Sequence, residues 1–275
     1  MTEKVKKEDD KQTPNKLLYK NSLWLFFDYI IKIILISVLW FFFSTPFFYL
    51  GYVFIVGGLK IFTMYLWLLI IIMFSPFSFG AAYAVLQIVS QVVTAPKMEM
   101  FDKVYDKSEI KVKLFFNGIF KYFWKSFLLI IINIIISGFL YLNIYFYWHI
   151  LVPKMQLLGL LLTGIMIWVT LIYSLMTVYF IPLLITKKIN VFKAIYQSFL
   201  LVIDNVFFSI SLALLNVSLT IILIFTLAGF FLIYYGIMII LMLLGYFVIY
   251  RKYDETIEIS EEKRNFKSLI RPWSS

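Results

Sequence analysis

The chain has 275 residues, of which 63% are hydrophobic and 20% are aromatic, and its net charge is +10. Soluble domains are about 45–50% apolar, so this composition excludes a water-soluble globular protein and indicates an integral membrane protein. The sequence has no cysteine and a single histidine, His149, which excludes disulfides, thiolate chemistry and a histidine cluster within one chain. We expect an all-α polytopic membrane helix bundle that holds no cofactor and no metal.

Six stretches are long and apolar enough to cross a bilayer, which takes about 20 residues of helix. In chain order they cover Ile33–Val56, Ile61–Phe79, Phe127–Trp148, Leu157–Ile185, Val206–Leu227 and Phe231–Tyr250. The last two form one apolar block, which we divide near Gly229 or Gly236. The predicted organisation is a mobile cytoplasmic arm over residues 1–28, a six-helix membrane domain over 29–250 and a cytoplasmic tail over 251–275.

Charged residues gather on one side of the predicted spans. Only two of the 25 basic residues, Lys60 and Lys154, fall in the three connections of the opposite side, and all 15 acidic residues lie on the side of the other basic residues. Lys and Arg are retained in the cytoplasm during insertion. We therefore expect both termini at the cytoplasmic face of a bacterial membrane, which an even number of spans also requires.

This basic face predicts contact with anionic lipid headgroups, at about 1 kcal/mol per basic residue near the surface. An acidic protein or a nucleic acid is the alternative partner for such a charge; we favour lipid and expect no nucleic acid. The predicted spans themselves contain no ionisable Asp, Glu, Lys or Arg side chain. Because proton relays and charged-substrate pathways place such groups at membrane depth, neither function is expected.

Polar and small residues form stripes along several predicted spans. After Pro76, where a helix should kink or restart, Gly80, Ala84, Gln87 and Gln91 share one helical face. Comparable residues in the later spans are Asn133, Ser137, Thr163, Thr170, Ser174, Thr177, Asn216 and Thr220, with a second internal proline at Pro182. Such stripes favour helix–helix packing. The alternative is a passage for a neutral polar solute lined by Asn133, Thr170, Asn216 and Thr220.

Two segments of the basic side are amphipathic. In Lys111–Phe127 the side chains of Lys113, Lys121 and Lys125 share one side and aromatic side chains cover the other. In the shorter segment after Asn190, we expect Phe192, Ile195 and Phe199 to point inward and Lys193 and Gln197 to point outward. This pattern is typical of helices that lie in the membrane interface. Docking of a cytoplasmic protein is the alternative interpretation.

Catalytic constellations are not evident in the sequence. His149 is interpreted as an interfacial polar cap, and Lys60 and Lys154 as residues that extend to the membrane surface. The chain has no phosphate-binding glycine-rich loop of either common form. We therefore expect that the protein is not an enzyme.

Three segments resemble the YesL-like family of multi-pass bacterial membrane proteins, a domain of unknown function. They are WFFFSTP at Trp40–Pro46 with SPFSFGAAYAVLQ at Ser75–Gln87, FFNGIFKYFWKSFLL at Phe115–Leu129, and VYFIPLLITKKINVFKAIYQSFLL at Val178–Leu201. The resemblance implies an accessory or scaffold role linked to carbohydrate uptake, with sugar-transporter subunits as partners, and it implies no catalytic residues. The alternative from the polar stripes is a small carrier or channel for a neutral solute. The sequence does not indicate an oligomeric state.

Overall fold

The computed structural model describes residues 13–56, 60–94, 112–187, 189–226, 228–255 and 257–259. Within these ranges the chain is almost entirely helical. The helices are α2 (Pro14–Asp28), α3 (Ile30–Val56), α4 (Lys60–Val89), α5 (Val112–Phe146), a π-helical turn η1 (Tyr147–Leu151), α6 (Gln156–Lys187), α7 (Val191–Asp204), α8 (Val206–Phe225), α9 (Ala228–Leu232) and α10 (Tyr234–Tyr250). The strands β1 (Val93–Thr94) and β2 (Glu258–Ile259) form one short antiparallel pair.

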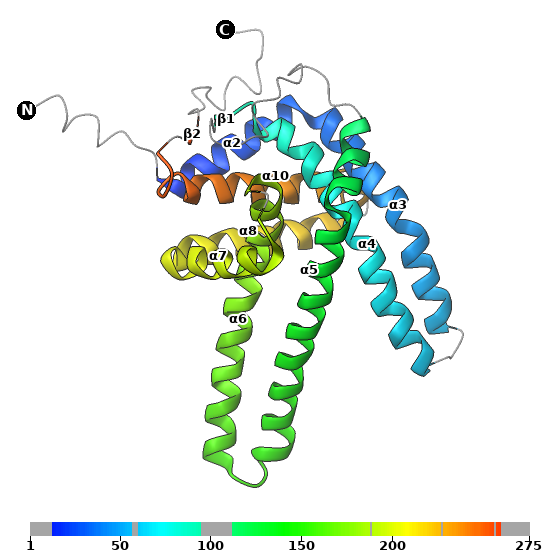
Figure 1. The fold of residues 1–275 in the computed structure, drawn as a ribbon, viewed down its shortest axis with the longest axis vertical. Coiled ribbons are helices and arrows are strands. Elements are labelled where there is room, and N and C mark those ends of the chain that lie inside the picture. Colours follow the sequence, from blue (N-terminus) through cyan, green and yellow to red (C-terminus); the bar gives the residue numbers. More distant parts are fainter. Residues whose placement is uncertain are drawn as a thin grey trace, which may run out of the picture.

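Two helical hairpins extend from a broader upper part, which we call the head (Figure 1). The α5–α6 hairpin points downward, and the α3–α4 hairpin leaves the head beside it at a tilt. The head contains α2, α7, α8 and α10 together with the adjoining ends of α4, α5 and α6, and α8 and α10 lie crosswise to α5 and α6. The β1–β2 pair joins the segment after α4 to the segment after α10.

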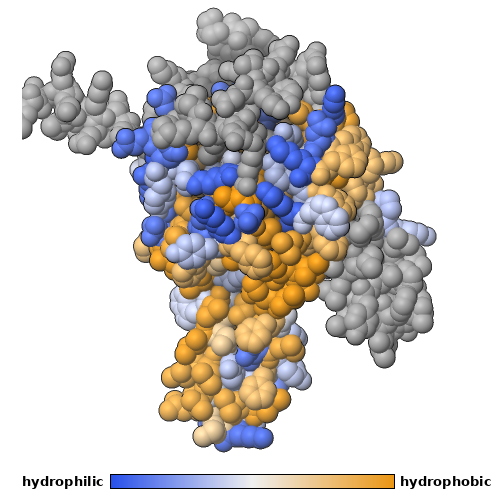
Figure 2. All heavy atoms as spheres, in the orientation of Figure 1, coloured by the Kyte–Doolittle hydropathy of each residue, from blue (hydrophilic) through white to orange (hydrophobic). Residues whose placement is uncertain are grey.

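The fold is a helical membrane bundle. Three helices, Val112–Leu151 with its π turn included, Gln156–Lys187 and Val206–Phe225, are long and apolar enough to cross a membrane among the residues described. A fourth span results if α2 and the first part of α3, which meet at an 86° bend, are counted as one broken span. Hydrophobic side chains cover the hairpin, and hydrophilic ones gather over the head (Figure 2).

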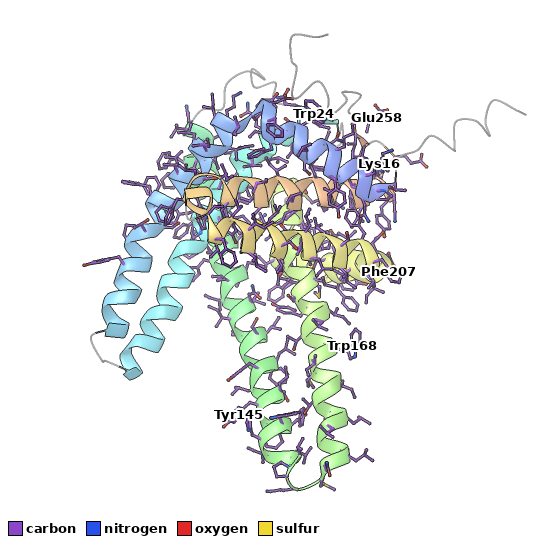
Figure 3. All side chains as sticks on the ribbon, turned by 180° about the vertical axis from the view of Figure 1, so that it is seen from behind. Lys16, Trp24, Tyr145, Trp168, Phe207 and Glu258 are labelled. Atoms are coloured by element: carbon purple, nitrogen blue, oxygen red, sulfur yellow. The ribbon has the colours of Figure 1, made fainter. Side chains whose placement is uncertain are left out.

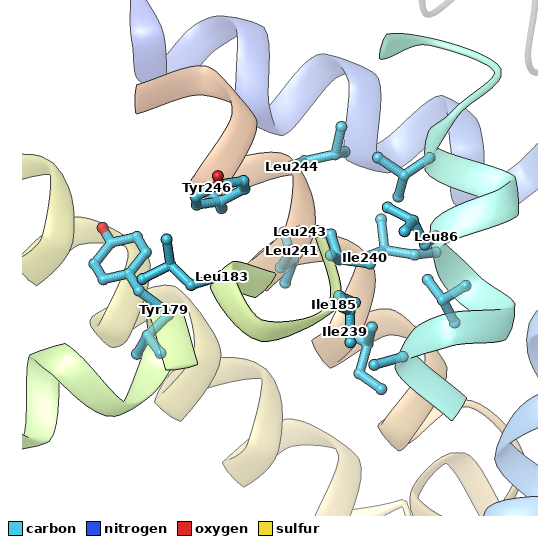
Figure 4. Close-up of a cluster of buried hydrophobic side chains, with 14 of the residues drawn as sticks. Leu86, Tyr179, Leu183, Ile185, Ile239, Ile240, Leu241, Leu243, Leu244 and Tyr246 are labelled. Carbon is cyan, nitrogen blue, oxygen red and sulfur yellow. The ribbon is translucent and has the colours of Figure 1, made fainter. Parts of the chain in front are cut away.

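The most deeply buried helix is α10, which lies inside the head. Its side chains from Ile239 to Ile249 are buried, apart from the half-buried Met242. Figure 4 shows them between side chains of α4 and α6, including Leu86 and Ile185. The uniformly apolar sequence of α10 agrees with this position, because a helix that is hydrophobic all round must be covered on every side.

The predicted mobile arm over residues 1–28 contains a helix, α2, over Pro14–Asp28. From Pro14 onward the chain is helical and packs against α10, and its side chains Leu17, Leu18, Trp24 and Leu25 are buried. Pro14 suits the first helical turn because its missing N–H would have no partner there. Burial stabilises each of these large side chains by about 1.5–3 kcal/mol relative to exposure to water, so the apolar residues of the arm hold it in place.

Other boundaries also differ from the sequence-based expectation. Helices α4 and α6 continue through Pro76 and Pro182, which are both buried; helices in membrane proteins tolerate proline where neighbouring groups satisfy the backbone. The basic–aromatic segment Lys111–Phe127 supplies the first turns of α5 from Val112 and is not a separate helix. The long apolar block divides around Gly229, between α8 and α10, whereas Gly236 lies inside α10.

Candidate functional site

A close helix crossing joins α4 to α5 at two glycines, Gly80 and Gly118. A Cβ placed on Gly80 would lie 2.7 Å from the backbone oxygen of Phe115, and one placed on Gly118 would lie 2.9 Å from the Cα of Gly80. Larger residues would therefore push the two backbones apart. Ala84, one turn beyond Gly80, is also buried. The Gly–Ala stripe of α4 thus lies in a helix–helix contact, the arrangement that small residues allow in membrane proteins.

A second close approach joins α10 to α3. The backbone N–H of Gly236 donates to the Oγ of Ser37 at 2.9 Å, and a Cβ on Gly236 would lie 2.7 Å from Ile33 Cγ2. One turn along α3, the Trp40 ring stacks on Tyr235 with centroids 4.0 Å apart, and its indole N–H donates to Ser78 Oγ at 3.3 Å. Three helices, α3, α4 and α10, meet at this point.

Tyrosines link α6 to its neighbours at three levels. The Tyr173 hydroxyl donates to Asn133 Oδ1 of α5 at 2.8 Å. The Tyr179 hydroxyl lies 2.9 Å from Ser209 Oγ of α8. Near the end of α6, the Tyr122 hydroxyl of α5 donates to the carbonyl of Ile185 at 3.1 Å. The pattern of small residues did not reveal these links, although three tyrosines flanked by apolar residues were a usable signal, since a buried tyrosine hydroxyl usually finds a partner.

Lysine side chains surround the junction of α5, α6 and α10. Lys125 Nζ donates to the Ile189 carbonyl at 3.1 Å. Lys121 Nζ lies 4.9 Å from the centre of the Tyr83 ring, and Lys187 Nζ lies 3.8 Å from that of Tyr250, whose hydroxyl also accepts from it. Cation–π contacts of this kind contribute about 0.5–1 kcal/mol at exposed sites.

A polar cluster closes the bend between α7 and α8. At this bend, Asn205 accepts from Lys252 Nζ at 2.6 Å and donates to the Tyr253 hydroxyl at 3.0 Å. The Tyr253 hydroxyl in turn donates to Asp204 Oδ2 at 3.0 Å. Burial is the largest cause that raises the pKa of Tyr253 above its ordinary value, so the hydroxyl stays protonated and able to donate. The cluster fixes the end of α10 to the α7–α8 bend.

The predicted stripe residues of α5 and α6 lie at different exposures. Asn133 and Thr170 are half-buried and Thr163 is buried, whereas Ser137 and Ser174 are exposed. The hydroxyls of Thr163 and Thr170 donate within their own helix, to Gly159 and Met166, at 2.8 Å each. Thr177 donates to the Ser174 carbonyl at 2.7 Å. Internal bonds of this type satisfy a hydroxyl in an apolar setting without requiring a ligand.

Asn216 and Thr220 occupy α8. Asn216 is buried, its Nδ2 donates to the Leu212 carbonyl at 2.8 Å, and its Oδ1 is buried without a hydrogen-bond partner among the residues described. Thr220 Oγ1 donates to the Asn216 carbonyl at 2.7 Å and lies 3.9 Å from Met238 Sδ of α10. Since α8 lies crosswise to α5 and α6 (Figure 3), these residues and the Asn133–Thr170 pair belong to differently directed helices.

The remaining predicted residues lie at the ends of helices. Gln91 Nε2 lies 3.5 Å from the Gln87 carbonyl, to which Ser90 Oγ also donates at 2.7 Å. Lys113 is exposed. His149 is exposed in the π-helical turn, with its ring 4.6 Å from the Tyr145 ring.

The predicted orientation of α7 is wrong. Phe192 and Phe199 were expected to point inward but are 69% and 42% exposed. The buried residues are the smaller ones, including Val191, Ala194 and Ser198, because α7 packs closely against α6. Lys193 is exposed, as expected. Ile195 and Gln197, expected on opposite faces, are both half-buried, so the predicted division of α7 into an apolar inner face and a polar outer face does not match the structure.

Comparison of the chain with models of known protein families, with curated proteins and with solved structures finds no match. Within the described ranges, no group of three or more His, Cys, Asp or Glu side chains is placed to hold a metal ion. The acidic residues 99, 102, 106 and 109 lie outside those ranges. The geometry therefore assigns the polar groups of the long helices mainly to contacts between or within helices.

Proposed function

We propose that this chain is a non-enzymatic multi-pass membrane protein that serves as an accessory or scaffold component, linked to carbohydrate uptake. The observation that carries the proposal is the use of polar groups in the long helices. Tyr173 pairs with Asn133, Tyr179 pairs with Ser209, and Ser37 receives the N–H of Gly236. These bonds join helices to one another. The link to carbohydrate uptake rests on the resemblance to YesL-like proteins.

The proposed location is the cytoplasmic membrane of a bacterium, with both termini in the cytoplasm. Six apolar segments, which correspond to α3, α4, α5, α6, α8 and α10, make up the proposed membrane domain, in which the α5–α6 hairpin crosses the bilayer. The charge distribution supports this orientation, because Lys154 lies at the tip of the α5–α6 hairpin, far from the lysines of the head. Anionic headgroups are the proposed partners of the head lysines.

Capture from mild detergent tests the scaffold role. A tagged copy should recover subunits of a sugar permease from a membrane in which both are produced at native levels. The matched control is an unrelated tagged protein with a similar number of spans, which should not recover them. Recovery of the bare protein alone across several mild detergents contradicts the proposal.

A carrier for a neutral polar solute is the second candidate, and the buried Oδ1 of Asn216 favours it, since this atom has no partner among the residues described. Flux of a panel of sugars and polyols into vesicles containing the purified protein tests it. Asn216→Leu should abolish the flux, whereas Val217→Leu, a change at the exposed neighbouring residue, should leave it unchanged. Flux equal to that of empty vesicles across the panel contradicts this candidate.

A further inference from the structure

The α8–α10 hairpin and the α5–α6 hairpin point in different directions. In both opposite views, α8 and α10 run across the molecule while α5 and α6 run along it (Figures 1 and 3). A bilayer has a single normal, and a helix of 20 residues such as α8 spans about 30 Å only when it lies near that normal. The two hairpins therefore cannot both cross the membrane in this arrangement, although α8 is long and apolar enough to do so.

The α5–α6 hairpin defines the direction of the normal. Residues 126–146 of α5, between Lys125 and the π-helical turn, form a helix of roughly 31 Å at 1.5 Å per residue. This length matches the hydrocarbon core of about 30 Å. The outward side chains along it are large and apolar, with Ile135 64%, Phe139 62% and Leu142 63% exposed. A helix that shows such residues to its surroundings at every level is covered by lipid.

With the membrane normal along α5 and α6, α7 lies at the edge of the hydrocarbon core. Lys125, at the upper limit of the apolar part of α5, donates to the Ile189 carbonyl at 3.1 Å. Ile189 lies two residues before α7 begins. At the other end of α7, the charged side chains of Asp204 and Lys252 meet at the bend through Asn205 and Tyr253. Both ends of α7, and the start of α8, are therefore at a polar level.

Most of the outward side chains of α7 and α8 are nevertheless apolar or aromatic, with Lys193, Asp204 and Ser218 as exposed polar residues among them. Phe207 and Phe225, at the two ends of α8, are 91% and 85% exposed. Phe192 and Tyr196 of α7 are 69% and 63% exposed. A continuous apolar surface of this size is unfavourable in contact with water and indicates contact with another apolar phase. A helix with an apolar outer face at the polar boundary is the arrangement of an interfacial helix.

We propose that α7 and α8 form an interfacial shelf on the cytoplasmic leaflet, and that α8 and α10 do not cross the membrane. The chain then crosses four times, through α3, α4, α5 and α6, which keeps both termini on one side. Lys125, which contacts Ile189 just before α7, and Lys193 of α7 border the shelf and face the anionic headgroups of that leaflet. Figure 2 shows the corresponding boundary, with hydrophilic side chains above and hydrophobic ones below.

The shelf rests only on the membrane placement of the α5–α6 hairpin in the proposed function, and a depth measurement tests the two separately. The chain has no cysteine, so nitroxide labels can be attached at single introduced cysteines in the full-length protein, in vesicles of phosphatidylethanolamine and phosphatidylglycerol. The positions on α8 are Phe207→Cys, Leu214→Cys and Phe225→Cys, all at exposed side chains. Accessibility to oxygen and to a water-soluble nickel complex reports the depth of each label.

The shelf predicts that all three α8 labels lie at one shallow depth, about 5–10 Å below the headgroups. If α8 instead crossed the membrane, the labels at Phe207 and Phe225 would lie on the order of 27 Å apart along the membrane normal, and the label at Leu214 would be the deepest. That result overturns the shelf. Labels at Leu128, Ile135 and Leu142 of α5 should show such a profile, deepest at Ile135. A flat profile on α5 overturns the membrane placement itself, and the shelf with it.

Discussion

The ammonium of Lys252 and the amide oxygen of Asn205 lie 2.6 Å apart, and this contact fixes the end of α10 to the bend between α7 and α8. Asn205 interrupts the helix there, and its amide also donates to the Leu201 carbonyl at 3.2 Å. The side chain of Asn205 thus lies where α7 ends and also accepts a hydrogen bond from Lys252, which follows α10. Both roles depend on an amide that can donate and accept at once.

Asn205→Ala should loosen the α7–α8 bend. The change leaves Lys252 without its acceptor and Tyr253 without a donor. Because both side chains are exposed and can bind water instead, the expected cost is the net contribution of the lost hydrogen bonds, about 0.5–1.5 kcal/mol each. We expect faster cleavage by a protease near residue 205 and a lower unfolding temperature in detergent. Lys193→Ala, at an exposed side chain of α7, is the matched control and should leave both unchanged. Equal behaviour of the two variants would show that the cluster does not hold the bend.

Glycines at two positions of α5 should respond oppositely to the same change. Gly118→Ala places a Cβ 2.7 Å from Tyr83 Cβ and should destabilise the protein by about 1–3 kcal/mol, because the helices must separate. Gly138→Ala meets nothing within 4 Å, so it should be neutral or slightly stabilising, since alanine favours the helix. Thermal unfolding in a mild detergent measures both. Similar losses for the two variants would mean that the α4–α5 crossing is looser than the structure shows.

The bond between Tyr179 and Ser209 should contribute measurably to the contact between α6 and α8. Tyr179→Phe removes one hydroxyl and should cost on the order of 0.6 kcal/mol, the average for such bonds in membrane proteins. A double-mutant cycle with Ser209→Ala separates this coupling from the effects of each change alone. Tyr145→Phe, at a half-exposed ring, is the control. A coupling energy of zero would assign the contact to apolar packing alone.

Much of the architecture follows from the amino-acid pattern. The helical class and the division of the last apolar block near Gly229 agree with the structure. Apolar runs and glycines set these features locally. The Gly80–Ala84 stripe was likewise readable from spacing, because small residues one turn apart allow two backbones to approach.

The directions of the helices were not readable in the same way. Length and hydropathy identify α8 as a span, yet its course depends on Asn205, which turns the chain, and on Gly245 of α10, where a Cβ would lie 2.6 Å from Leu212. Likewise, the packing of α2 against α10 is a contact between segments far apart in the sequence. Tertiary contacts decide such features, whereas periodicity reports only which faces are apolar.

The orientation of the chain is the central claim, and cysteine labelling tests it most directly because the sequence has no cysteine of its own. A membrane-impermeant maleimide should react in intact cells with Lys154→Cys, at the tip of the α5–α6 hairpin. It should react with Lys16→Cys and Glu255→Cys only after the membrane is opened. Reaction of Lys16→Cys in intact cells, with Lys154→Cys protected until the membrane is opened, would contradict the account.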